Sequence, residues 1–293
     1  MKIKVKSKKI RILTAILLAA VFAVAMAMTF KLTNPTVAYA DDSAFASETE
    51  IFYKGGTLYS TANETISYAT KSVESYNIND SYPNYYNTDS ALKNACAAVA
   101  GANIIGFYDR YFDDLIPNVT VGVMRGTEYN YHSMTRNLTQ KQAVINTLFT
   151  YMQTNQSGDG ATRSQFQSGL KKYINGKGLN ITYNSVMTNG ALDLNKVKTQ
   201  LKSGNPIALY MSGYAFSLID DSGKEVNIMK QIYNDNHIAV VFGYDKINYY
   251  NASGALIKTK TFLKVSNGKN ISENLYIVSD YGKLNDADAA YVY

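Results

Sequence analysis

Apolar residues recur at spacings of three and four in the first two thirds of the chain, and this pattern predicts amphipathic helices. Residues 91–112 contain a run of small residues, 97–102, that would let a neighbouring element approach closely, so we expect a central helix here. Further helices are predicted over 139–153, 162–175 and 193–201. Thr139 is the expected N-cap of the second helix, with Gln142 three places later.

Shorter runs in the second half of the chain predict strands, most of them after the helices. A turn is expected at Ser253-Gly254, between two long strands. Helices that come first and antiparallel strands that come second predict an α+β fold, in which an N-terminal helical part packs on a C-terminal antiparallel sheet. The expected strands cover residues 180–187, 206–211, 237–250, 256–265, 275–279 and 289–293.

The first forty residues have a pattern of their own, and we expect them to be a signal peptide. Basic residues cluster from Lys2 to Arg11, residues 12–30 are almost entirely apolar, and Ala38-Tyr39-Ala40 offers the small residues that signal peptidase needs. An uncleaved membrane anchor is the alternative, because the apolar run is long enough to cross a bilayer. The signal peptide predicts that the protein is secreted or lies at the cell surface, and its long basic start is typical of Gram-positive bacteria.

The signal segment also explains the basic character of the whole sequence. It holds seven of the 29 lysines and arginines and no acidic residue, which leaves 22 basic against 23 acidic residues in the mature chain. A mature net charge near −1 does not support a basic nucleic-acid-binding face. The only membrane association that the sequence predicts is the one through the export signal.

Cys96 is the only cysteine of the chain. Exported proteins usually use cysteines in pairs, and a lone one cannot form a disulfide within the chain. It is therefore a buried small residue, an intermolecular link or a reactive thiol. If Asn94 caps the helix, Cys96 lies in the first turn, where the helix dipole favours a thiolate. If Asp89 or Ser90 caps it, Cys96 lies in the middle of the helix.

Two histidines are available as a base for such a thiol. His132 lies in a polar stretch without a clear face and is expected to be structural or solvated. His237 stands at the polar entrance of an apolar strand, a position that would hold an imidazole at a sheet edge on a rigid element. The alternative for His237 is a purely structural residue at the end of that strand.

Three segments together resemble the bacterial papain-like cysteine peptidases, including the double-glycine leader peptidase group. Asn94 to Gly101, followed by Phe107-Tyr108, resembles their nucleophile helix. Gly204 to Leu209 resembles the Gly-x-Pro-apolar strand, and His237 to Tyr244 resembles the histidine strand. The separation of 141 residues between Cys96 and His237 also suits these folds. The resemblance implies a Cys–His–Asn/Asp triad and a peptidase domain over residues 86–293, after a lead-in segment or arm over 41–85.

Strand register identifies a candidate third member of the triad. A three-residue hairpin loop at 252–254 would pair Ala239 with Asn267, which places Asn267 diagonal to His237 on the same face. A two-residue loop would shift the register by one and favour Asn270. Asn267 is our choice, with Asn270 and Asp280 behind it, whereas Asn251 would lie at the far end of the hairpin. The segment 262–268 also resembles the strand that ends in the family's triad Asn.

One position departs from the family pattern. These peptidases commonly have a Gln about six residues before the cysteine as an oxyanion donor, and this chain has Ser90 there. Asn87 or Asn94 would have to substitute, or the site is weakened.

The resulting prediction is an exported peptidase that acts on a peptide or protein substrate. It uses Cys96 as nucleophile, His237 as base and Asn267 as the residue that orients the imidazole. No cofactor is expected, because the scattered Cys and His residues give no zinc spacing and no phosphate-binding Gly-rich loop is present. The alternatives are a cell-wall amidase or transpeptidase on the same fold, or an inert exported binding protein, which the 25 tyrosines would also suit. The sequence does not predict an oligomeric state.

Overall fold

The computed structural model describes residues 60–78, 82–112, 115–117, 124–125, 128–129, 138–221, 223–269, 276–278 and 283–293. The signal segment, residues 41–59 and 79–81 of the lead-in segment, His132, Asn270 and Asp280 lie outside these residues.

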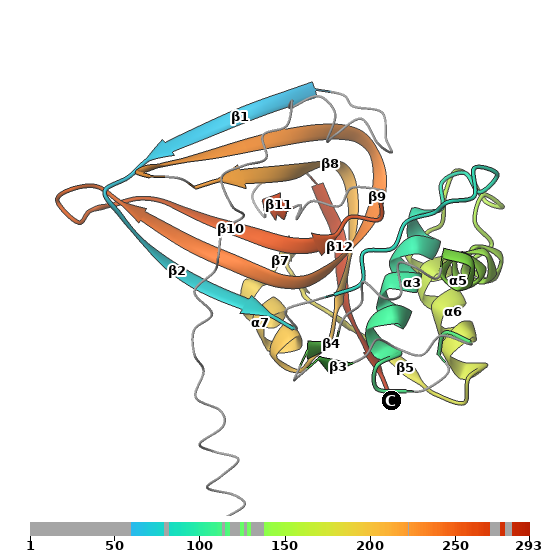
Figure 1. Cartoon of the computed structure of the whole chain (residues 1–293). Coiled ribbons are helices and arrows are strands. Elements are labelled where there is room, and N and C mark those ends of the chain that lie inside the picture. Colours follow the sequence, from blue (N-terminus) through green and yellow to red (C-terminus); the bar gives the residue numbers. More distant parts are fainter. Residues whose placement is uncertain are drawn as a thin grey trace, which may run out of the picture. The chain divides into compact units, whose positions relative to one another are not determined.

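An antiparallel sheet of eight strands dominates the described part of the chain (Figure 1). The strand order is β1-β9-β10-β11-β8-β12-β5, and β2 also pairs with β9. Its strands are β1 (Ser60–Ser67), β2 (Thr70–Asn77), β5 (Ile181–Ser185), β8 (Ile207–Asp220), β9 (Glu225–Tyr250), β10 (Leu256–Ser266), β11 (Tyr276–Val278) and β12 (Lys283–Val292). Two separate two-stranded ladders join β3 (Met124–Arg125) to β4 (Glu128–Tyr129) and β6 (Met187–Thr188) to β7 (Ala191–Leu192).

The long strand β9 organises the sheet. Its first part pairs with β1 and β8, and its last part pairs with β2 and β10. It therefore bends as it passes from one set of partners to the other, and Figure 1 shows this bend on the side of the helices. The bend is where the sheet meets the helical part of the fold.

Three helices lie together beside that bend: α3 (Cys96–Tyr108), α5 (Leu138–Tyr151) and α6 (Arg163–Asn175). The small residues of α3 allow it to contact α5, α6 and β9. Gly106 shows how close this packing is, since an added Cβ would lie 2.5 Å from the hydroxyl oxygen of Tyr85. A fourth helix, α7 (Leu194–Lys202), contacts β2 and β8.

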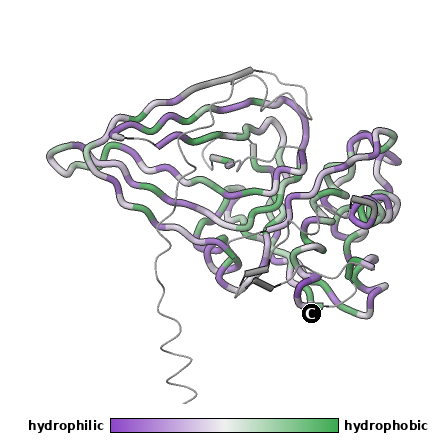
Figure 2. The backbone as a smooth tube through the Cα atoms, in the orientation of Figure 1, coloured by the Kyte–Doolittle hydropathy of each residue, from purple (hydrophilic) through white to green (hydrophobic). Residues whose placement is uncertain are grey.

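Two apolar cores lie on the two faces of the sheet. Ile238, Val240 and Phe242 of β9 join the core that the three clustered helices complete. Ala239 and Val241 point the other way, into a core shared with α7 and β8. This alternation is the period-two pattern of a strand that is buried on both faces. Figure 2 shows hydrophobic positions along the strands and the helices.

The α+β class and the antiparallel sheet are confirmed. The expected order of elements is wrong in one respect, because β1 and β2 precede the helices and pair with β9 within the same sheet. All four predicted helices are present, but the predicted Thr139 cap is wrong because α5 already begins at Leu138. The third helix has the capping box instead, formed by Thr162 and Gln165.

Candidate active site

Cys96 is the first residue of α3. Of the two helix starts that the sequence left open, the structure therefore has the one that places Cys96 in the first turn, but the cap is Ala95, which makes no side-chain capping bond. Asn94 is not the cap, since its backbone is left-handed at φ 55°. The alternative start at Asp89 or Ser90 is wrong, because both residues lie in the loop before the helix. Cys96 thus lies among the unpaired N–H groups and at the positive end of the helix dipole.

Side-chain amides hold the loop that leads into α3. The Asn155 Nδ2 donates to the carbonyl of Lys93 at 3.0 Å, and the Asn94 Nδ2 donates to Asn155 Oδ1 at 3.2 Å. The Asn87 Nδ2 donates to the carbonyls of Asp89 and Leu92, at 2.8 and 3.0 Å. The two amides that could have replaced the missing Gln as oxyanion donors therefore have loop-fixing roles.

His237 lies in β9 opposite Met211 of β8, and it is 5% exposed. Its ring stacks on Tyr214, with the ring centres 4.9 Å apart, and meets the edge of Phe216 at 5.7 Å. Its Nε2 lies 2.8 Å from the backbone carbonyl oxygen of Asn267. A carbonyl oxygen can only accept, so Nε2 carries the proton and the lone pair of the neutral ring is on Nδ1.

The position of Asn267 follows from strand register. The hairpin closes with Asn251 opposite Ala255, as predicted for the three-residue loop. Two bulges then occur, one at Ile257 in β10 and one at Phe242 in β9, and they shift the register by one residue in opposite senses. Ser266 is again opposite Val240, so Asn267 follows at the level of Ala239.

Asn267 contacts the histidine through its backbone and not through its side chain. The Asn267 Oδ1 accepts the backbone N–H of Lys269 at 2.7 Å, which fixes the turn after β10. The predicted neighbourhood of His237 and Asn267 is thus present, whereas the orienting group is the main-chain carbonyl. Asn251 is at the tip of the hairpin, where its side chain accepts the N–H groups of Ser253 and Ala255.

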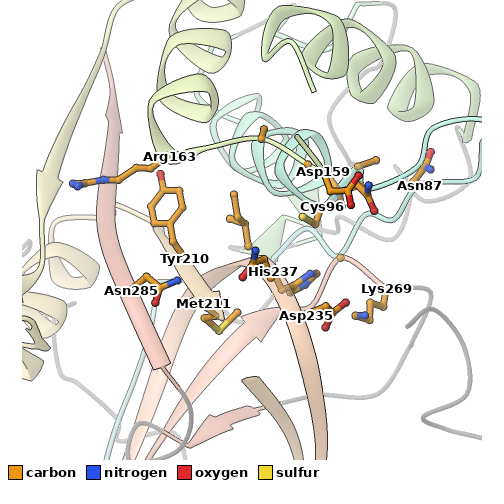
Figure 3. Close-up of a pocket in the computed structure, with 18 of the residues that line it drawn as sticks. Asn87, Cys96, Asp159, Arg163, Tyr210, Met211, Asp235, His237, Lys269 and Asn285 are labelled. Carbon is orange, nitrogen blue, oxygen red and sulfur yellow. The ribbon is translucent and has the colours of Figure 1, made fainter. Parts of the chain in front are cut away.

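Cys96 and His237 line one cavity of about 1060 Å³. Figure 3 shows Cys96 on α3, with His237 facing it from the sheet. Asp235 and Lys269 lie together on one side of the pair, and Arg163, Tyr210 and Asn285 lie on the other. The walls combine aromatic rings with amides and charged groups.

The sulfur and the imidazole are both neutral in this arrangement. Burial raises the pKa of the Cys96 thiol, and the N–H groups of Ile238 and Ala97 and the charge of Lys269 only partly offset this. Burial lowers the pKa of His237 to about 3, assisted by the positive charge of Lys269 and opposed by the bond to Asn267. Cys96 as a whole residue is partly exposed, and it lines the cavity.

Sequence reasoning missed three neighbours of this pair: Tyr214, Asp235 and Lys269. Asp235 stands two residues before His237, and Lys269 two residues after Asn267, so proximity along the chain was the available signal. Tyr214 carried no such signal, because only the pairing of β8 with β9 brings its ring onto His237.

No group of three or more His, Cys, Asp or Glu residues that could hold a metal ion occurs within the described ranges. The same residues contain no helix that is long and apolar enough to span a membrane. No protein-family model, curated protein or solved structure matches the chain.

Proposed function

We propose that the protein is an exported cysteine peptidase with a papain-like arrangement of its site. The observation that carries this proposal is the shared cavity, into which α3 brings a thiol at its first residue and β9 brings an imidazole of fixed tautomer. A helix tip placed against an antiparallel sheet is the feature that the resemblance of the sequence implied. Residues 1–40 would be the export signal, and the surroundings would be the cell surface or medium of a Gram-positive bacterium.

The chemistry begins with the proton of the thiol. Nδ1 of His237 takes this proton as the sulfur of Cys96 attacks the carbonyl carbon of the substrate. The tetrahedral oxyanion that forms is stabilised by backbone N–H groups at the start of α3. His237 then gives the proton to the departing amine, which leaves a thioester on Cys96. Water, deprotonated by His237, hydrolyses the thioester and restores the thiol.

The resting charge state differs from the thiolate that the first turn of a helix was expected to favour, because burial of Cys96 raises its pKa more than the neighbouring groups lower it. A thiol of raised pKa beside an imidazole of lowered pKa is a neutral pair, and its proton moves only when a substrate carbonyl is attacked. The carbonyl of Asn267 holds the ring throughout, and it can also stabilise the imidazolium that forms. The side-chain amide that usually has this task in a Cys–His–Asn triad is replaced by a main-chain oxygen.

A peptide library incubated with the purified protein tests the proposal. Cleavage should occur, a thioester to Cys96 should be trapped by mass spectrometry, and both should vanish in Cys96→Ser. His237→Gln should lose turnover while Cys96 stays accessible. Reaction with purified peptidoglycan but with no peptide would favour the amidase or transpeptidase alternative. A thiol that reacts only after denaturation would refute the enzyme and leave the inert binding protein.

A further inference from the structure

The turn that follows β10 is seated between α3 and the ring of His237. Gly268 lies between them, where an added Cβ would lie 3.2 Å from Val99 Cγ1 and 4.0 Å from His237 Cε1. Its left-handed φ of 68° also favours glycine. Together with the bond from the Lys269 N–H to Asn267 Oδ1, this packing fixes the backbone of Lys269 beside the site.

The side chain of Lys269 is buried, which is unusual for a lysine. Its ammonium lies 4.5 Å from the ring centre of Tyr233 and 5.6 Å from that of Tyr214. Tyr214 stacks on Tyr233 at 5.0 Å and on His237 at 4.9 Å. The ammonium thus lies against aromatic rings in a stack that continues to the imidazole, and Lys269 lines the same cavity as Cys96. Burial lowers the pKa of Lys269, and the carboxylate of Asp235 opposes this and favours the charged form.

We propose that Lys269 assists the reaction through its positive charge. This charge would stabilise the Cys96 thiolate and the oxyanion formed during attack. It would compensate for the side-chain donor that is missing near Ser90, since Asn87 and Asn94 are engaged in the loop. This inference rests on the proposed peptidase function.

The charges around the sulfur agree with this role. Lys269 lowers the pKa of Cys96, whereas Asp235, on the bulged part of β9, raises it. Lys269 also helps to keep His237 neutral, so that Nδ1 remains free to take the thiol proton. Tyr214 and Tyr233 have raised pKa values through burial and the nearby carboxylate, so they carry no charge at neutral pH.

Two alkylating reagents of different charge measure this field at the sulfur without any need for turnover. Rates of Cys96 alkylation by neutral iodoacetamide and by anionic iodoacetate are followed against pH for the wild type and for Lys269→Met, Lys269→Arg and Asp235→Asn. In Lys269→Met the apparent pKa of the thiol should rise, and the iodoacetamide rate at neutral pH should fall at least about threefold. The iodoacetate-to-iodoacetamide ratio should fall as well, and Lys269→Arg should restore both quantities.

Asp235→Asn is the matched control, because it removes a charge of the opposite sign and should shift both quantities the other way. Wild-type values in Lys269→Met would overturn the role of Lys269 and leave the peptidase proposal standing. A Cys96 that reacts in no folded variant would overturn both. If Lys269→Met does not fold, by circular dichroism, Lys269→Gln takes its place, and failure of both neutral variants to fold would show a structural role instead.

Discussion

The buried neutral state of His237 makes the stability of the protein depend on pH. Burial first, and the charge of Lys269 second, lower the pKa of this imidazole from 6.5 to about 3. Below pH 6.5 the unfolded chain binds a proton at this residue and the folded protein does not, so acid favours unfolding. Each pH unit in this window costs about 1.4 kcal/mol, so a change from pH 6.5 to 5.0 removes about 2 kcal/mol of unfolding free energy.

Replacement of His237 by Gln isolates this contribution. The variant loses the ring stack on Tyr214 and is expected to be less stable at pH 7, but its unfolding free energy should change about 2 kcal/mol less than that of the wild type over the same window. Urea unfolding of both proteins at half-unit steps between pH 6.5 and 5.0 measures the difference. His132 and the carboxyl groups are common to both proteins and cancel. Parallel pH profiles of the two proteins would show that folding leaves the pKa of His237 unchanged, and would refute the argument that burial keeps this imidazole from binding a proton.

Three further results are expected. The alkylation rate of Cys96 by iodoacetamide should keep rising through pH 8 and 9, because the pKa of this thiol is raised; a plateau at neutral pH would indicate a preformed ion pair. Asp288→Asn should lower the unfolding free energy in urea by about 2 kcal/mol, since the buried carboxylate accepts two 2.6 Å bonds from Arg163; an unchanged midpoint would contradict this. Gly106→Ala should cost about 1–2 kcal/mol by the same assay, because its Cβ would collide with Tyr85; greater stability would show that the ring yields.

Periodicity and strand register predicted more of the site than composition did. The spacing of apolar residues located the helix that carries Cys96, and the hairpin loop length placed Asn267 beside the strand of His237. That second prediction holds because the two bulges between β9 and β10 cancel. A single bulge would have moved the pairing by one residue, and no pattern in either strand predicted two.

Other features depend on contacts between distant parts of the chain. The start of α3 was ambiguous because Asn94 is a good capping residue. In the structure its side-chain amide donates instead to Asn155 Oδ1, far away in the sequence. The pairing of β1 and β2 with β9 was equally hidden, because a polar segment with few apolar positions gives a weak strand pattern. Local propensity could not decide either case, since the competing partner lies far away in sequence.

The use of a backbone oxygen to orient His237 has a consequence for how the site tolerates change. A side-chain amide can be removed by one substitution. The backbone carbonyl at position 267 remains in every variant of this residue, provided that the turn after β10 keeps its geometry. The geometry of that turn depends on Gly268, which fits between Val99 and the histidine ring, and on the Asn267 side chain that accepts the N–H of Lys269. The asparagine therefore matters for the shape of the turn, and through that shape it sets both the tautomer of the imidazole and the place of the buried lysine.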